Sequence, residues 1–120
     1  MVDGNNVVGS AADGWWRDRP AAARRLVERL ACFSRVTGDD VMVVFDVAHP
    51  DLPAGSHGGV EVAYASRSGR DAADDRVREL VRRGDVVVTS DRALAADVAA
   101  AGAAVLGSGA FLARLQQDGC

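Results

Sequence analysis

Residues 41–46 read VMVVFD, an unbroken apolar run that ends in an aspartate. A continuous run of this kind, rich in β-branched residues, is typical of a parallel strand that is buried on both faces. Two further apolar stretches end in the same way, MVD at residues 1–3 and VVVTSD at residues 86–91. In an open parallel α/β sheet, ligands bind outside the carboxyl ends of the strands, which lie along one edge. Three aspartates are therefore predicted to meet at that edge: Asp3, Asp46 and Asp91.

Signals for strand and helix alternate along the rest of the chain. We expect strands at residues 2–3, 41–45, 60–65, 86–89 and 103–106, and helices at residues 21–33, 71–83, 93–101 and 108–116. Pro20 suits a helix start, Gly84 and Gly102 suit helix ends, and residues 4–19 and 47–59 are expected to be loops. This order predicts an α/β fold of the small doubly wound kind with a mostly parallel sheet. The length fits a single domain over residues 1–120.

The composition favours a packed globular domain. Hydrophobic residues make up 48% of the chain, which suits a core rather than disorder. No apolar run approaches the roughly 20 residues that a membrane span needs, and Asp3 and Asn5 stand where the apolar part of a signal peptide would begin. Cys32 and Cys120 are the only cysteines. Two isolated cysteines predict no disulfide framework and a reducing, cytoplasmic setting, with Cys32 as a small buried hydrophobic residue.

A fourth carboxylate is predicted from helix geometry. At about 100° per residue, the apolar residues of the helix at 71–83 fall within one arc that should face the sheet. These residues are Ala73, Val77, Leu80 and Val81. Asp74 lies just beside that arc, in the first turns, and is the helix carboxylate best aimed at the strand ends. Asp71 and Asp75 lie further round, toward solvent. A role for any of the three at the positive helix N-terminus is the alternative.

Four carboxylates at one place would repel one another unless they are protonated or neutralised by a cation. Hard oxygen ligands suit Mg²⁺ or Mn²⁺. Such ions polarise a phosphodiester, activate water and stabilise the leaving oxygen, so the predicted chemistry is hydrolytic phosphoryl transfer. Turn and helix-cap roles for the same aspartates are the alternative.

The residues that flank the aspartates suggest supporting roles. Gly4 allows the backbone to turn sharply after the first strand. Asn5 offers an amide that can hold a carboxylate or a metal-bound water, or that can form an Asx turn. Thr89 or Ser90 can hydrogen-bond a phosphate or a metal-bound water, and Ser90 or Asp91 can equally cap the following helix.

Together these motifs resemble a known family. The segments at residues 2–8, 43–46, 73–75 and 87–92 are similar, in sequence and in order, to those of YacP-like NYN domains, a branch of the PIN-like nuclease superfamily. The resemblance implies a PIN-like three-layer α/β/α sandwich, a metal-dependent ribonuclease activity and an RNA substrate, in some members on or near the ribosome. It carries site roles over to Asp3, Asn5, Asp46, Asp74 and Asp91, with Asp71 and Asp75 as helpers.

Candidate RNA contacts flank the predicted site. The net charge of −3 argues against a simple basic clamp, but all 14 cationic residues are arginine, the better phosphate fork. A coding bias toward Ala, Arg and Gly explains that composition equally well. We expect phosphate contacts from Arg67, Arg70 and Arg92, and base stacking from Trp15 and Trp16. The alternatives are a solvated surface for the arginines and a place at the core edge for one tryptophan. His49 and His57 lack a metal-ligand partner at useful spacing and are expected to be solvated.

The sequence thus favours a metal-dependent endoribonuclease that acts on RNA. The main rival is an RNA-binding module of the same fold with little or no nuclease activity. A receiver domain needs an acidic pair soon after the first strand and a lysine near the last strand, whereas this chain has Asn5-Asn6 and no lysine. A haloacid-dehalogenase-type phosphatase needs a second aspartate two residues after Asp3, where Asn5 stands.

Overall fold

The computed structural model describes residues 1–120 and consists of a six-stranded sheet, five α-helices and one short 3₁₀ helix. The strands are β1 (Val2–Asp3), β2 (Val41–Phe45), β3 (Gly55–His57), β4 (Val60–Tyr64), β5 (Val86–Val88) and β6 (Ala104–Leu106). The α-helices are α1 (Gly4–Ser10), α2 (Arg19–Thr37), α3 (Ala72–Leu80), α4 (Arg92–Ala100) and α5 (Ser108–Gln117), and the 3₁₀ helix η1 is Trp15–Arg17.

The sheet is parallel except at one edge. Its strand order is β3-β4-β2-β1-β5-β6, and only β3 runs antiparallel to its neighbour. The two-residue β1 lies in the centre, where Val2 is opposite Val43 of β2 and Val88 of β5. The predicted mostly parallel sheet is therefore confirmed, and the carboxyl ends of β1, β2 and β5 lie side by side.

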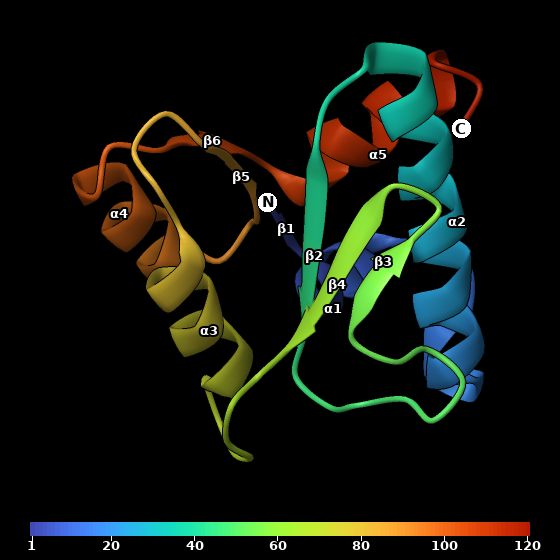
Figure 1. The fold of residues 1–120 in the computed structure, drawn as a ribbon, viewed down its shortest axis with the longest axis horizontal. Helices are drawn as coiled ribbons and strands as arrows, with labels where there is room; N and C mark the ends of the chain where they lie inside the picture. The colour runs from blue at the N-terminus through green and yellow to red at the C-terminus, as the bar shows by residue number, and fades with distance from the viewer.

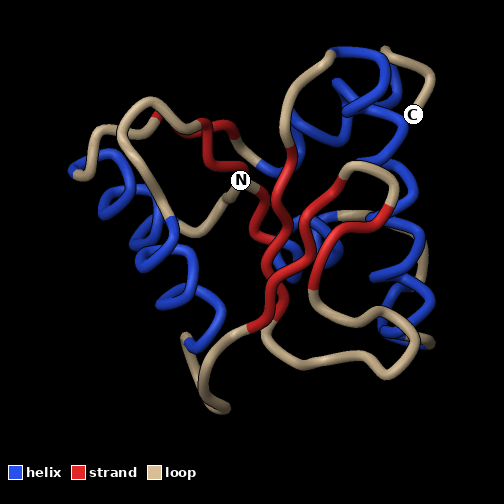
Figure 2. The backbone as a smooth tube through the Cα atoms, viewed as in Figure 1, coloured by secondary structure: helices blue, strands red, loops and turns tan.

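Helices cover both faces of the sheet (Figure 1). On one face, Val43 and Phe45 pack with buried residues of α1, α2 and α5. On the other face, Val44 and Val87 pack with buried residues of α3 and α4. The change of face between Val43 and Val44 follows the two-residue repeat of a strand. The strands form the layer between these two groups of helices (Figure 2), so the predicted three-layer α/β/α architecture is confirmed.

The long helix α2 has end signals that can be read in the sequence. The Asp18 carboxylate accepts a hydrogen bond from the Ala21 amide at 3.1 Å and caps the helix start. Gly38 ends the helix in the left-handed conformation, with a φ of 76°. Leu26 and Leu30, one helical turn apart, are buried against the sheet. No helix, α2 included, is both long and apolar enough to cross a membrane.

Two segments expected to be loops contain regular structure. Residues 4–10 form α1, although the sequence GNNVVGS is poor in strong helix formers. Tertiary packing explains this helix, because Val7 is fully buried in the core. The expected loop at residues 47–59 contains β3, which pairs with β4 at the sheet edge. Conversely, α3 ends at Leu80, earlier than expected, because Val81 takes an extended conformation.

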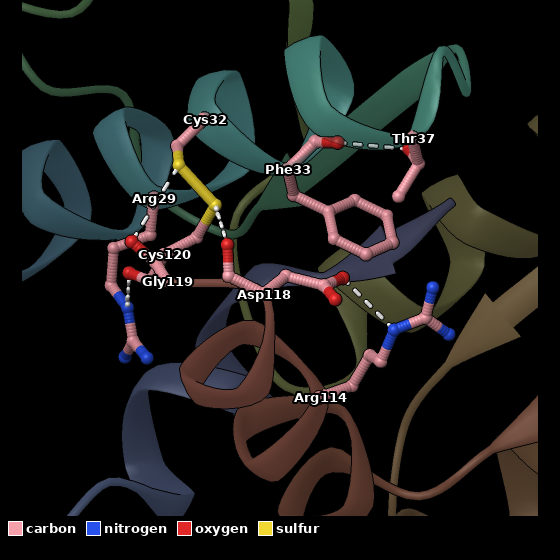
Figure 3. The surroundings of a disulfide bond; sticks show 8 residues. All are labelled: Arg29, Cys32, Phe33, Thr37, Arg114, Asp118, Gly119 and Cys120. Carbon is pink, nitrogen blue, oxygen red and sulfur yellow. Dashed lines mark hydrogen bonds and ion pairs between the residues drawn. A yellow bond between two sulfur atoms is a disulfide. The ribbon is translucent and has the colours of Figure 1, made fainter.

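The C-terminal end of the chain is bonded covalently to α2. Cys32 and Cys120 form a disulfide across 88 residues of sequence, with their Cα atoms 5.7 Å apart (Figure 3). The prediction of no disulfide was therefore wrong, and Cys32 is half-buried rather than fully buried. Sequence separation hid the pairing, since only the packing of α5 against α2 brings the two cysteines together. The Arg29 side chain also donates a hydrogen bond to the Cys120 carbonyl at 2.9 Å.

Candidate active site

An open hollow of about 370 Å³ lies at the carboxyl ends of β1 and β2, beside the start of α3. We call it the carboxylate hollow. Its polar lining consists of Asp3, Asn5, Asn6, Asp46, Arg70, Asp71, Asp74 and Asp91. All four aspartates predicted to form the site therefore border one space, and they come from four separate segments of the chain.

Asp3 is the buried member of the set. It ends β1 and is only 3% exposed. One of its carboxylate oxygens accepts a hydrogen bond from the Thr89 hydroxyl at 2.8 Å. Burial raises the pKa of Asp3 from 3.8 to about 6; the Thr89 hydrogen bond opposes this rise, and the charges of Asp74 and Asp91 add to it. Asp3 is thus held where a negative charge is unfavourable unless a proton or a cation accompanies it.

Asp74 is half-buried in the first turn of α3. Burial raises its pKa, as do the charges of Asp91, Asp71 and Asp75, while the charge of Arg78 opposes the rise. Helix α3 has no side-chain cap, because Asp71, the residue before the helix, makes no capping hydrogen bond. Asp74 and Asp75 both lie in the first turn of α3, so the alternative role at the positive helix N-terminus stays open for Asp74, whose carboxylate also borders the hollow.

Asp91 combines the two roles that the sequence left open. Its Oδ1 atom accepts a hydrogen bond from the Leu94 amide at 3.0 Å, so Asp91 caps α4. Asp91 also borders the carboxylate hollow. The Thr89 hydroxyl oxygen accepts a hydrogen bond from the Asp91 amide at 3.1 Å while it donates to Asp3. Thr89, which is 1% exposed, thus joins two of the four aspartates.

The start of α1 fixes the position of Asp46. The Asn5 side-chain oxygen accepts a hydrogen bond from the Asp46 amide at 2.8 Å, which ties the end of β2 to α1. Gly4 makes this close approach possible, since a Cβ atom there would lie 2.6 Å from the Phe45 ring and 2.9 Å from the Val44 carbonyl oxygen. Gly4 was expected to allow a sharp turn; instead it is helical, and lack of space is what requires glycine. The Asp46 side chain itself is exposed.

Asn6 is a positioning residue that the sequence did not single out. Its side-chain oxygen accepts hydrogen bonds from the Ser90 amide at 2.8 Å and from the Ser108 hydroxyl at 2.5 Å. The Ser90 hydroxyl in turn accepts a hydrogen bond from the Ser108 amide at 2.9 Å. The predicted supporting residue Ser90 therefore connects α1, the loop after β5 and α5, and it does not line the hollow. The Asn5-Asn6 pair beside Asp3 was the signal that could have pointed to this role.

Of the three predicted arginine contacts, only Arg70 lines the hollow. Arg67 pairs with Asp75, which also pairs with Arg78 at 3.0 Å. The hydrogen bond from Arg67 is the largest cause that lowers the pKa of Asp75. The charge of Arg67 and the hydrogen bond and charge of Arg78 lower it further. Arg67 and Asp75 are thus engaged with each other outside the hollow. Arg92 is exposed next to Asp91 and makes no ion pair.

The aromatic residues lie outside the carboxylate hollow. Trp15 and Trp16 pack edge to face with ring centroids 6.1 Å apart. Trp15 is half-buried and Trp16 is 59% exposed, which agrees with the alternative that one tryptophan covers the core edge. His49 was expected to be solvated but is half-buried beside Phe45. His57 is also half-buried, with a ring nitrogen 2.6 Å from the Pro53 carbonyl oxygen.

The donor set of the hollow fits a hard divalent cation in its chemistry. The charged side chains that line it are five aspartates and Arg70, and neither histidine nor cysteine is among them. In this arrangement, however, no group of three or more His, Cys, Asp or Glu side chains is placed to hold a metal ion. For the four aspartates to share one ion, their carboxylates would have to lie closer together than they do here. A common ligand shell for the four aspartates stays a prediction.

Three layers, a mostly parallel sheet and carboxylates at its strand ends fit the PIN-like class of fold. The chain belongs to the family of YacP-like NYN domains, whose family model matches residues 1–119. Two crystal structures of Rae1 (YacP) from Bacillus subtilis, one of them a mutant, are similar in fold, with TM-scores of 0.79 for the mutant and 0.77 for the other. Each is 24% identical to this chain. The matches cover 98% of this chain, and 74% of the mutant and 72% of the other Rae1 chain. No curated protein sequence matches the chain.

Proposed function

We propose that this protein is a metal-dependent endoribonuclease that hydrolyses RNA phosphodiesters at the carboxylate hollow. The observation that carries the proposal is the meeting of Asp3, Asp46, Asp74 and Asp91 around one open space in a PIN-like fold. Burial and the neighbouring carboxylates raise the pKa of both Asp3 and Asp74. A cluster of this kind is suited to a cation and unsuited to an anionic substrate on its own.

Mg²⁺ or Mn²⁺ held by these four aspartates would polarise the phosphodiester and activate a water molecule for hydrolysis. The chain supplies the positions of the carboxylates. Thr89 orients Asp3, Asn5 fixes the backbone of Asp46, and the cap of α4 fixes Asp91. No serine, histidine or cysteine lines the hollow. The only side chains there that could form a covalent intermediate are the aspartates. Because the proposal uses them to hold the cation, it assigns the attack on phosphorus to water.

The proposal of RNA as the substrate rests on the family, and two features of the hollow suit the phosphates of a strand. The hollow is open to solvent, and Arg70 in its lining offers a charged fork to a phosphate. We infer that the substrate is single-stranded RNA, and mRNA on the ribosome is the first natural form to test in view of the family. We propose a cytoplasmic location from the proposed RNA substrate alone, because the Cys32–Cys120 disulfide removes the argument from unpaired cysteines: such bonds persist mainly under oxidising conditions.

One observation favours a second candidate, an RNA-binding module without nuclease activity. The aspartates are not arranged to hold a metal ion in the present side-chain positions. If they do not rearrange, the fold would bind RNA without cutting it.

Incubation of single-stranded RNA with Mn²⁺ or with EDTA separates the two candidates. We expect cleavage with Mn²⁺ only, and loss of cleavage in Asp46→Asn. The Asp46 side chain is exposed, and the substitution keeps the single hydrogen bond from its backbone amide to Asn5. Cleavage that survives EDTA or Asp46→Asn would contradict the proposal. Binding without cleavage at any Mn²⁺ concentration would favour the binding module.

A further inference from the structure

A second hollow of about 290 Å³ adjoins the carboxylate hollow, with which it shares Asn5 and Asp46. We call it the aromatic hollow. Its walls come mainly from η1, the start of α2, the end of β2 and the segment after it: Trp15, Arg19, Phe45, Val47 and His49. A chain that places a phosphate at Asp46 can therefore place the next group of the same nucleotide in this space.

The charge of the aromatic hollow differs from that of its neighbour. Asp46 is its only carboxylate and Arg19 its only arginine, whereas five aspartates border the carboxylate hollow. The Arg19 guanidinium lies over the Trp15 ring, 5.3 Å from its centroid, and makes no ion pair. An uncharged, flat ligand suits this near-neutral space, since both an indole and a guanidinium plane offer stacking surfaces.

Contacts with neighbouring aromatic rings fix the His49 and Trp15 side chains of the aromatic hollow. The His49 ring packs edge to face on Phe45 at 6.1 Å and on Tyr64 at 6.3 Å, and the His49 amide donates a hydrogen bond to the Tyr64 hydroxyl at 3.4 Å. Trp15 is supported by Trp16 and is half-buried. Val47, in contrast, is 62% exposed although it lines the hollow. An exposed apolar side chain beside fixed aromatic rings leaves apolar surface free for a ligand.

We propose that the aromatic hollow binds one unpaired nucleobase of the RNA strand whose phosphate lies at the carboxylate hollow. This inference rests on the proposed function for the identity of the ligand. The volume of about 290 Å³ is at the small end of ligand pockets, which suits one base and not a folded segment of protein. The shared residues Asn5 and Asp46 make the base site continuous with the phosphate site.

The test measures binding of a fluorescein-labelled single-stranded hexanucleotide in Ca²⁺, and of matched strands with one abasic residue. Ca²⁺ takes oxygen ligands as Mg²⁺ does and neutralises the carboxylate hollow, and a gel run after each titration confirms that the strand is intact, so that the result does not depend on cleavage. We expect one abasic position to weaken binding by the wild type by about 5- to 150-fold, the range for one base stacked on an aromatic side chain. The Trp15→Ala variant should lose this abasic penalty, and Trp16→Ala, which is outside the hollow, should keep it.

A second pair of variants removes a charge and keeps both tryptophans. Arg19→Gln and Arg17→Gln each remove one exposed arginine, and Arg17 lies over Trp16, at 5.9 Å, outside the hollow. Both should lose the same general attraction to phosphates, but only Arg19→Gln should reduce the abasic penalty. Tryptophan fluorescence gives an independent readout, because the chain has only two tryptophans. RNA should quench Trp15 in the Trp16→Phe variant and leave Trp16 unquenched in Trp15→Phe.

The outcomes separate this inference from the proposed function. Equal binding of the intact and abasic strands by the wild type would overturn the base site, whether or not the protein cuts RNA with Mn²⁺. An abasic penalty that is unchanged in Trp15→Ala and in Arg19→Gln would also overturn it. A penalty lost in both variants, in a protein that never cuts RNA, would support the base site and contradict the nuclease.

Discussion

The two ends of the central strands hold similar acidic residues but differ in what surrounds them. At the amino ends, a hollow of about 410 Å³ includes Asp39, Asp40 and Asp85 in its lining. This amino-edge hollow is larger than the carboxylate hollow, yet most of its lining is hydrophobic. Asp39 and Asp40 are exposed, and Asp85 accepts a hydrogen bond from the Arg82 amide at 2.8 Å within a turn. These aspartates lie in solvent or fix the local backbone.

At the carboxyl ends, the only hydrophobic lining residues are Ala72 and Ala73. Asp3 and Asp74 feel both burial and the charge of Asp91, which together raise their pKa values. The comparison teaches that neither the volume of a hollow nor its number of aspartates marks a site. What distinguishes the carboxylate hollow is that carboxylates from distant segments lie near enough for the charge of Asp91 to raise the pKa of the buried Asp3 and of the half-buried Asp74.

Cleavage should show the largest difference between the two ends. We expect Asp74→Asn to lower Mn²⁺-dependent RNA cleavage by more than about 100-fold, because even the outer-shell partners of metal ligands are worth about 10- to 100-fold. The matched variant Asp40→Asn, at the amino-edge hollow, should cleave like the wild type. Initial rates on one labelled RNA measure both. Equal loss in the two variants would mean that total charge matters and the carboxylate hollow does not.

Stability with and without metal should show the next largest difference. A cation that binds only the folded protein adds about 2.7 kcal/mol to the free energy of unfolding at a hundredfold excess over its dissociation constant. Asp74→Asn should raise the metal-free melting temperature, because it removes one repelling charge, and should shrink the shift caused by Mn²⁺. Asp40→Asn should leave the Mn²⁺ shift intact. A wild type whose melting temperature ignores Mn²⁺ would argue against a metal site.

The pH dependence of stability should reveal Asp3. Its pKa is about 6 in the folded protein and 3.8 in the reference state. Between pH 6 and pH 3.8, Asp3 is therefore mostly protonated in the folded protein and mostly ionised in the unfolded chain. Metal-free stability should therefore rise by about 1 kcal/mol from this group as the pH falls from 7 to 5. Asp3→Asn keeps an acceptor for the Thr89 hydroxyl and should lack this gain. Urea unfolding at both pH values measures the difference, and identical gains in the two proteins would show that another group is responsible.

The smallest expected effect concerns RNA affinity. Arg70→Ala should lower the slope of log affinity against log salt by about 1, as the loss of one phosphate contact does. Arg67→Ala should have less effect, because Arg67 is engaged by Asp75. Arg83→Ala, next in sequence to Gly84 of the amino-edge hollow, serves as the control. Binding titrations at several salt concentrations test this order, and an equal slope in all three variants would place the RNA path elsewhere.

Much of the site could be predicted because it depends on strand ends. The runs at residues 41–46 and 86–91 are buried in a parallel sheet, and Asp46 and Asp91 follow them in chain order. The position of Asp74 followed from helix periodicity alone. Such features are local in sequence, so the spacing of apolar residues and the residues that end a strand or a helix are sufficient to place them.

The features that the sequence did not predict depend on packing between distant segments. Helix α1 is weak by propensity and forms because Val7 is buried in the core. Asn6 joins Ser90 and Ser108, which are 84 and 102 residues away. His49 becomes half-buried only because the rings of Phe45 and Tyr64 lie beside it. No local pattern encodes contacts of this range.

The Cys32–Cys120 bond divides the molecule into a closed ring and a free arm. Residues 32–120 form the ring, which contributes Asp46, Asp74 and Asp91, whereas the arm before Cys32 contributes Asp3 and Asn5. Closure of a loop this long restricts the unfolded chain by about 4.5 kcal/mol in the chain-entropy account, but it does not restrain the arm. Strand β1 of the arm lies between β2 and β5 of the ring. The candidate active site is therefore complete only when the arm has been inserted between two strands of the ring, whether the bond is closed or reduced.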